Sequence, residues 1–544
     1  MSFLERLALI GLGLLIFLPG VTARDLWNPD EPRYAEVARE MRQSGEYFVP
    51  HLNGRIYSEK PPLLFWSIAF ASLATGEVDE VAARLPSVFA AVAAMALLFG
   101  LARRLFDWRV AWWSTLVFAT SGRVLWQGRV GQIDMLLIAL VTGAMYCFVR
   151  GWLEERPGWF RLFFVMAGLA TLAKGPVGLL PPLLALLVFA WSTGNREVLK
   201  RLRLGTGLLI WAAIVLAWLV PAAISGGSEY LETLVVKQNL TRYADPWHHF
   251  KPFYYYLTVI PADFFPWSFF LPGALWIGWR RLTGEARRGF LFALAWVAVT
   301  LLFFSVSPAK RTVYILQMYP ALAMLVAAPC LEIEQSWPRL RGWLLWPTLL
   351  LAAFFAALPA AWPLLPRWAP RAAERARVAI APFEPGLLRD VLLLTLVLGV
   401  AACAAYWLGR SGRPGRTIGA LAAGMIAVAV YASVVVLPRF QPAKSARPLS
   451  EKLLALAAPG EPYAIYPRID PPFIFYTRRF AELPGSEAEL RAFAARQERV
   501  WLFITKDALA GLTEPLPLAE VARDAAREDG YVLLASPPKA LPPA

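Results

Sequence analysis

The sequence predicts a polytopic α-helical membrane protein with about thirteen spans and a C-terminal α/β domain. First, 58% of the 544 residues are hydrophobic and only 17% are charged, against roughly 25% charged in a soluble domain. Second, apolar stretches recur as far as about residue 437. Third, the remaining residues change to short apolar runs that alternate with segments of helical spacing. The mean hydropathy of +0.49 agrees with a membrane protein.

The predicted spans are windows of roughly 20 mostly apolar residues, the length that crosses a bilayer. They cover about residues 4–22, 83–102, 109–122, 132–149, 158–173, 176–193, 204–224, 262–279, 289–306, 312–331, 342–365, 387–409 and 418–437. The first window is expected to be retained, because its flank carries only Arg6 opposite Glu5 and makes a weak secretion signal. The stretch 62–75 is too short to cross comfortably and is expected to lie at the interface.

The domain boundaries follow from these windows. Residues 1–437 are expected to form the transmembrane domain, with extracytoplasmic loops at 23–82 and 225–261. Residues 438–544 are expected to form the α/β domain, with strands at 463–467, 473–476, 500–505 and 531–536 and helices at 447–457, 486–498 and 517–527. This region has no GxxxxGK[ST] and no GxGxxG motif, so no nucleotide-binding fingerprint is present.

The charge distribution predicts the orientation. If the N-terminus is cytoplasmic, the predicted cytoplasmic segments hold about +12 of the total net charge of +15. Positively charged loops stay in the cytoplasm, so the first loop, the 225–261 loop and the C-terminal domain are predicted to face the other side. The C-terminal domain is nearly neutral, which excludes nucleic acid as the partner.

Cysteine and histidine give little indication of a metal or redox centre. All three cysteines fall in predicted spans, where they are expected to be small buried apolar residues. Three histidines in total cannot build a His-rich site. No cofactor is therefore expected to be required.

The first loop holds the most specific polar pattern. In WNPDEPRYAEVAREM (27–41), Asp30 precedes a helix with Pro32 in its first turn and an apolar stripe that suits a membrane surface. Asp30 is either an ordinary helix cap or a carboxylate held at the membrane surface as a base. Arg33, one turn on, either faces the same side or forms a surface salt bridge.

Several cations are predicted on the same side as Asp30. Lys60 precedes Pro61-Pro62 at a helix start, where the helix dipole disfavours a cation unless an anion binds there; a snorkelling lysine is the alternative. Lys174 and the pair Lys310-Arg311 stand at span ends, where headgroup anchors are also common.

The 237–257 segment adds Arg242, His249 and Lys251 among aromatic side chains. Its alternative interpretation is an interfacial aromatic belt with basic anchors. Taken together, one membrane face would carry a carboxylate and several cations. That arrangement suits transfer from a lipid-linked phosphate, because cations hold the anionic leaving group while the carboxylate orients or deprotonates the acceptor.

Several motifs resemble a known family. They are Asp30-Glu31-Pro32-Arg33-Tyr34, HLNGRIYSEKPPLLFW (51–66), GQID (131–134), LAKGPVGLLPP (172–182), YYYLTVIPADFFPWSFFLP (254–272) and KRTVYILQMYPALAML (310–325). With these motifs the chain resembles the GT-C-fold, lipid-linked-sugar glycosyltransferases of the protein-O-mannosyltransferase superfamily, and within it the bacterial aminoarabinose transferases of lipid A. The resemblance covers nearly all of the first 330 residues, and the first loop is its specific part.

The resemblance implies roles for individual residues. It makes Asp30, Glu31 and Asp134 the catalytic carboxylates. It makes the donor's phosphate ligands Arg33, Lys60, Lys174, Arg242 and Lys310. It places in the same cavity Tyr57, Glu59, His249 and Tyr314. It also makes a structural zinc on Glu59 and His249 conceivable, although two ligands do not define a zinc site.

The resemblance further implies a substrate class and a location. The donor would be a sugar on undecaprenyl phosphate, transferred with inversion at the periplasmic face of the bacterial inner membrane. The acceptor stays open among lipid A phosphates, protein hydroxyls and other envelope glycans. A transporter is the main alternative, but it would place ionisable residues near mid-membrane and show internal repeats. A non-catalytic assembly protein gives no reason for the cations around Asp30.

Overall fold

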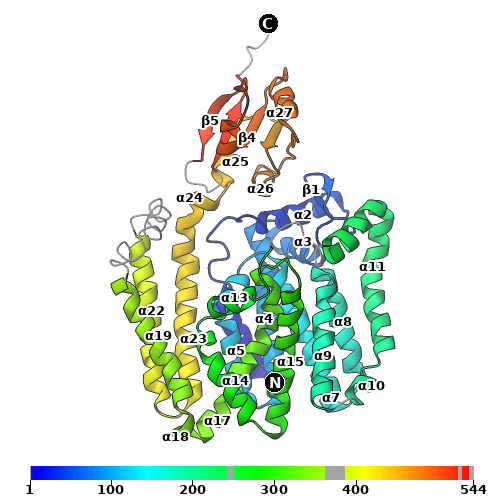
Figure 1. Cartoon of the computed structure of the whole chain (residues 1–544). Coiled ribbons are helices and arrows are strands. Elements are labelled where there is room, and N and C mark those ends of the chain that lie inside the picture. The colour runs from blue at the N-terminus through cyan, green and yellow to red at the C-terminus, as the bar shows by residue number, and fades with distance from the viewer. Residues whose placement is uncertain (1, 195–196, 242–249, 362–385, 525–529, 538–544) are drawn as a thin grey trace.

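The structure is a computed structural model that describes residues 2–194, 197–241, 250–361, 386–524 and 530–537. Figure 1 shows a bundle of long helices with a small sheet-containing domain at one end, and the helices of the first loop lie between the two. The predicted fold class, a polytopic helical protein with an α/β domain, is confirmed.

The first loop contains helices and one tight hairpin. Helix α1 (Phe3–Phe17) leads into α2 (Glu31–Ser44), strands β1 (His51–Leu52) and β2 (Arg55–Ile56), and α3 (Leu63–Thr75). Asn53 and Gly54 join the two strands with φ of 58° and 70°, the left-handed conformation that an Asn-Gly hairpin turn requires. Helix α3 falls on the predicted interfacial stretch.

The helical bundle follows in chain order. Its elements are α4 (Glu80–Leu105), α5 (Trp108–Ala119), α6 (Gly122–Gln127), α7 (Ile133–Glu154), α8 (Pro157–Lys174), η1 (Pro176–Gly178), α9 (Leu180–Ser192), α10 (Glu197–Arg201), α11 (Leu204–Leu231), η2 (Glu232–Thr241), α13 (Tyr255–Asp263), η3 (Trp267–Phe270), α14 (Leu271–Arg280), α15 (Gly284–Val306), η4 (Thr312–Met318), α16 (Tyr319–Ala327), α17 (Cys330–Gln335), α18 (Trp337–Leu340), α19 (Gly342–Ala361), α22 (Leu387–Gly409), α23 (Pro414–Tyr431), η7 (Ala432–Val436), η8 (Leu437–Phe440) and α24 (Gln441–Lys444).

Within the described ranges, eight helices are long and apolar enough to cross a membrane. The other predicted windows fall on shorter, less apolar or interrupted helices. The window 262–279, for example, is divided among α13, η3 and α14, with Pro266 directly before η3. The count of about thirteen spans stays a prediction, and the multi-span character is shown.

The core of the bundle centres on α7, which packs against α4 and α8, while α15 packs against α9. Helices α19, α22 and α23 form a separate packed group, seen at one side of the bundle in Figure 1. Helix α7 begins, and α8 ends, on the side of the first loop, so residues at these two ends can meet there.

The C-terminal domain has a four-stranded sheet in the order β3-β4-β6-β5. Its strands are β3 (Tyr463–Tyr466), β4 (Trp501–Thr505), β5 (Ala519–Arg523) and β6 (Tyr531–Ala535), and its helices are α25 (Arg447–Leu456), α26 (Pro471–Thr477), α27 (Glu487–Ala494) and α28 (Lys506–Ala510). Strands β3 and β4 are parallel, and the other two pairs are antiparallel.

Two predicted elements of this domain are wrong. The expected strand 473–476 lies in α26, where all seven residues are buried, so no helical alternation of polar and apolar residues is visible in the sequence. The prolines Pro471 and Pro472 suit the first turn of that helix. The expected helix 517–527 contains the edge strand β5, because pairing with β6 overrides its local spacing.

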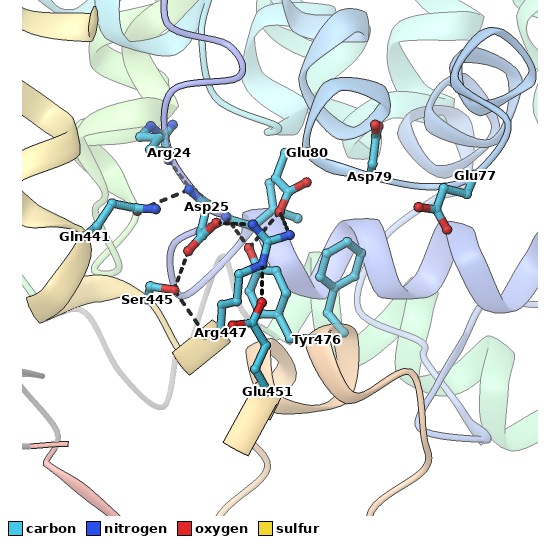
Figure 2. Close-up of polar contacts among 12 residues, drawn as sticks. Arg24, Asp25, Glu77, Asp79, Glu80, Gln441, Ser445, Arg447, Glu451 and Tyr476 are labelled. Atoms are coloured by element: carbon cyan, nitrogen blue, oxygen red, sulfur yellow. Dashed lines mark hydrogen bonds and ion pairs between the residues drawn. The ribbon is translucent and has the colours of Figure 1, made fainter. Parts of the chain in front are cut away.

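Polar contacts hold the C-terminal domain on the first loop. Figure 2 shows Arg447 reaching Asp25 and Glu80, at 2.7 Å and 3.0 Å respectively. Ser445 Oγ donates to Asp25 Oδ2 at 2.6 Å. The Tyr476 hydroxyl accepts from the Leu26 amide and donates to Glu80. The domain is therefore attached to the segment that leads directly to Asp30.

Candidate active site at the first loop

Asp30 is buried at the start of α2 and does not cap it, because its side chain makes no hydrogen bond to the helix backbone. The cap interpretation is therefore wrong. Its Oδ1 is paired with Arg33, and its Oδ2 accepts from Gln132 Nε2 at 3.1 Å and from Arg311 Nη2 at 3.3 Å. Three side chains from separate parts of the chain thus fix one carboxylate.

A cavity of about 120 Å³ opens beside this carboxylate. Two carboxylates and three cations line it, together with apolar and aromatic side chains. Its lining residues are Asp30, Tyr34, Lys60, Ile133, Asp134, Lys174, Val177, Gln238, Phe304, Ser307, Ala309, Arg311, Val313 and Tyr314. The predicted residues Asp30, Lys60, Asp134, Lys174 and Tyr314 thus come together in one place, although they are spread over 285 positions of sequence.

Asp134 and Lys174 form an ion pair in this cavity. Asp134 lies in the first turn of α7 and Lys174 in the last turn of α8, the ends where helix dipoles favour an acid and a base respectively. The Lys174 ammonium also lies 5.1 Å from the centroid of the Tyr314 ring. Lys174 therefore has a fixed position at the cavity wall, with part of its charge balanced by Asp134.

Glu31 lies beside Asp30 in sequence but is not among the residues that line this cavity. Its carboxylate pairs with Arg24 at 2.6 Å and Arg84 at 2.8 Å and accepts from the Gly131 amide at 3.0 Å. Burial opposes its ionisation, but the two guanidinium groups outweigh burial and hold the pKa of Glu31 well below its usual range. Glu31 ties the GQID segment to α2 and so sets the position of Gln132, which bonds Asp30.

The predicted residues Arg33, Tyr57 and Glu59 do not line this first cavity. They line a second cavity, which faces the C-terminal domain. Arg33 Nη1 lies 3.5 Å from Glu59 Oε2, and the Tyr57 hydroxyl donates to the same oxygen at 3.3 Å. Lys60 lines the first cavity, and its ammonium donates to the carbonyl of Glu59 at 3.1 Å. The first loop thus borders both cavities.

Lys310 is buried, and its ammonium donates to the carbonyls of Ser307 at 2.5 Å and Lys251 at 3.1 Å. Burial lowers the pKa of this ammonium. Lys310 is not among the residues that line the first cavity, whereas its neighbour Arg311 is. Arg242 and His249 lie outside the described residues, so of the suggested zinc pair the structure describes only Glu59. Within the described part of the chain, no three His, Cys, Asp or Glu side chains are grouped to hold a metal.

Sequence reasoning did not assign site roles to Gln132, Tyr34 and Arg311. Gln132 precedes Ile133 in the GQID motif, which is the one sequence signal that could have indicated it. The sequence predicts Lys310 as a phosphate ligand and leaves Arg311 as a cation at a span end, where headgroup anchors are also common. Lys310 and Arg311 are adjacent in sequence, but their side chains have different partners. Lys310 donates to backbone carbonyls, whereas Arg311 pairs with Asp30.

The fold and the site define a polytopic membrane protein with the GT-C architecture. The crystal structure of ArnT from Cupriavidus metallidurans in the apo state matches with a TM-score of 0.81 at 21% identity, over 98% of this chain and 99% of that one. The same protein bound to undecaprenyl phosphate matches with a TM-score of 0.80 at 20% identity, over 99% of this chain and all of that one. At these identities the likeness shows the shared fold.

Sequence comparison agrees with the structural likeness. Residues 59–220 match the family described as dolichyl-phosphate-mannose-protein mannosyltransferase. The undecaprenyl phosphate-alpha-4-amino-4-deoxy-L-arabinose arabinosyl transferase of Aeromonas hydrophila is 32% identical over 330 residues, 59% of either chain. Its namesake in Pectobacterium carotovorum is 32% identical over 333 residues, 60% of this chain and 59% of that one.

The aligned region spans about three fifths of the length of these curated relatives. The resemblance to GT-C lipid-linked-sugar glycosyltransferases and to their aminoarabinose transferases is confirmed.

Proposed function

We propose that the chain is an inverting glycosyltransferase. It moves a sugar, 4-amino-4-deoxy-L-arabinose, from undecaprenyl phosphate to lipid A or another envelope acceptor at the periplasmic face of the bacterial inner membrane. The names of the curated relatives support the sugar and its carrier, and the undecaprenyl-phosphate complex of the structural relative supports the lipid. The predicted charge bias of the loops supports the orientation.

One observation carries the proposal: the buried Asp30 carboxylate borders a cavity that also presents Lys60, Lys174 and Arg311. In the proposed reaction, the bond between the anomeric carbon and the phosphate oxygen breaks, and an acceptor oxygen bonds that carbon from the opposite face. The electron pair of the broken bond stays on the leaving phosphate. The cations stabilise its growing negative charge.

The role of Asp30 depends on the acceptor. A hydroxyl acceptor must lose a proton, and Asp30 is then the general base. A phosphate acceptor is already anionic near neutral pH, and Asp30 then orients the reacting groups or holds the sugar's ammonium. In both cases, Arg33, Gln132 and Arg311 hold the carboxylate in one orientation, so little reorganisation is needed during the reaction.

The test is sugar transfer by the purified full chain with undecaprenyl-phosphate aminoarabinose as donor and lipid A as acceptor. Asp30→Asn is expected to lower kcat by about 100-fold or more, the usual loss on removing one preorganised catalytic group. Asp507→Asn, at the start of the exposed helix α28, is the matched control and should keep full activity. An Asp30→Asn variant as active as the parent would contradict the site.

The proposed mechanism requires no metal, because cations of the chain itself hold the phosphate. Incubation of the purified protein with a chelator is expected to leave the transfer rate unchanged. A rate that falls with chelator and returns on addition of zinc would show that the mechanism is wrong.

Mass spectrometry of lipid A from cells with and without the gene tests sugar and acceptor together. A mass difference of one aminoarabinose is the expected result. An unchanged lipid A with an altered protein or polysaccharide glycan would instead favour the protein O-mannosyltransferase-like or another envelope-glycan activity. A lipid or sugar transporter would move donor lipid across the membrane without forming any product.

A further inference from the structure

A second cavity lies at the seam between the first loop and the C-terminal domain, and we call it the seam cavity. Its volume is about 410 Å³, within the range of small-ligand sites. The first loop contributes Asn28, Arg33 and Glu59 to its walls, and the C-terminal domain contributes Arg468, Asp470 and Tyr531. The cavity therefore exists only where the two parts of the chain meet.

Fixed contacts on the seam keep these walls in place. Asn28 Nδ2 donates to Asp470 Oδ1 at 2.5 Å. Asn53 and Ala481 exchange two hydrogen bonds of 2.8 Å, and both residues are buried. Arg39 donates to the carbonyls of Ile474 and Phe475 in α26. The two parts of the chain are thus joined by polar contacts, and the Asn28–Asp470 contact lies in the wall of the cavity itself.

Both cationic and carboxylate side chains line the seam cavity. The first loop contributes the guanidinium of Arg33, and the C-terminal domain contributes the exposed Arg468. Arg33 Nε is buried and has no hydrogen-bond partner among the described residues. Guanidinium groups bind phosphate by paired hydrogen bonds, while the carboxylates of Glu59 and Asp470 accept hydrogen bonds from hydroxyl groups. This combination matches a saccharide that carries a phosphate.

Arg33 connects the seam cavity to the candidate active site. One end of its guanidinium pairs with Asp30, and the other lies 3.5 Å from Glu59 in the seam cavity. A ligand held in the seam cavity therefore lies one side chain away from Asp30. The cavity that contains Lys60, Lys174 and Arg311 is on the other side of the same pair.

We propose that the seam cavity binds the phosphorylated sugar headgroup of the acceptor, with Arg468 as a specificity-determining residue. The acceptor then reaches Asp30 from the side of the C-terminal domain, while the donor's phosphate occupies the cavity around Lys174. This inference rests on the proposed transferase function. It gives the C-terminal domain a part in choosing the acceptor.

Steady-state kinetics of the purified full chain with lipid A as acceptor test the proposal. Arg468→Ala is expected to raise KM for lipid A about tenfold with little change in kcat or in KM for the donor. Arg468→Glu should raise it further. The matched control is Arg523→Ala on the edge strand β5, where an exposed arginine pairs with Glu520 of the same strand. An unchanged KM for lipid A in Arg468→Glu would overturn the proposal.

A soluble probe tests the site independently of the lipid. Glucosamine 1-phosphate is expected to compete with lipid A but not with the donor, and to lose most of its effect in Arg468→Glu. Glucosamine or inorganic phosphate alone should inhibit far less. Glucosamine lacks the phosphate that the arginines would bind, and inorganic phosphate lacks the sugar hydroxyls that the carboxylates would bind. Competition with the donor only would place the probe in the other cavity and contradict the proposal.

The two proposals fail in different ways. If the parent protein transfers no sugar, the proposed function fails, and the seam cavity is then tested by calorimetric titration with glucosamine 1-phosphate. Saturable binding that Arg468→Glu removes would support the site. No binding to the parent protein would overturn it.

Discussion

At the scale of single residues, the decisive feature is that the Asp30 carboxylate is held by side chains and not by the backbone amides of its own helix. Arg33, Gln132 and Arg311 all donate to its two oxygens. Gln132 is 102 residues away and Arg311 is 281 residues away, so only the folded chain reveals them. The sequence could indicate that Asp30 is a candidate catalytic carboxylate, but not which side chains would donate hydrogen bonds to it.

Substitution of Arg311 tests whether its contact with the Asp30 carboxylate matters for catalysis. Arg311→Gln removes a cation from the cavity and weakens the hold on Asp30, so we expect kcat to fall by about 10- to 100-fold, in the range for losing one electrostatic contact. Arg288→Gln, an exposed arginine near the start of α15, should leave kcat unchanged. Equal activity of the parent and Arg311→Gln would show that Arg311 serves only as an anchor.

Glu36 provides a pH test. It is buried on α2, and this burial raises its pKa to about 7 even though Arg39 opposes the shift. Between the ordinary value of 4.5 and about 7, the folded protein binds more protons at Glu36 than the unfolded chain does. The contribution of Glu36 to the free energy of unfolding therefore falls as pH rises through this window.

We expect Glu36→Gln to flatten this dependence, measured as Tm of the purified protein between pH 5 and pH 8. Glu514→Gln replaces an exposed carboxylate and should retain the slope of the parent. If Tm of the Glu36→Gln protein changed with pH as steeply as Tm of the parent, other titrating groups would be the cause of the pH dependence.

At the scale of elements, the local sequence pattern predicted a helix or strand correctly when burial and strand pairing in the folded chain favoured the same structure. Helix α2, with its proline in the first turn, follows from its residues. Helix α26 and strand β5 do not, because complete burial conceals the periodicity of the first and pairing at the sheet edge determines the second. The seam contacts also lack a sequence signal, since they join residues more than 400 positions apart.

Arg447 on α25 tests the attachment of the C-terminal domain. Arg447→Glu places a third carboxylate beside Asp25 and Glu80, so we expect the contact to weaken by about 1–3 kcal/mol. Faster protease cleavage between the bundle and the domain is the measurement. Arg478→Glu alters the exposed pair with Glu77 and should change cleavage little. Equal cleavage of Arg447→Glu and the parent would contradict this role.

At the scale of the whole molecule, hydropathy predicted the membrane bundle and composition predicted the appended domain. The exact number of spans does not follow from either, because helices such as α13, η3 and α14 are interrupted within one apolar window. The site also depends on whole-molecule geometry. It forms where the first loop meets the start of α7, the end of α8 and the residues before η4.

The predicted topology is tested by adding protease to spheroplasts. A fragment containing residues 438–544 should be cleaved and released, because the charge bias places this domain outside the cytoplasm. A tag inserted between α22 and α23, on the predicted cytoplasmic side, should stay protected. Protection of the C-terminal domain under conditions that cleave a known periplasmic protein would show that the orientation is reversed.

The position of Arg33 has a thermodynamic consequence. The Arg33 guanidinium pairs with Asp30, which lines one cavity, and lies near Glu59, which lines the other. An anion that binds Arg33 in the seam cavity would therefore change the charge balance at Asp30. Binding at the two cavities is then linked, and the linkage must be equal in both directions. In the proposed reaction, an acceptor bound in the seam cavity would change the affinity for the donor, and the donor would change the affinity for the acceptor by the same factor.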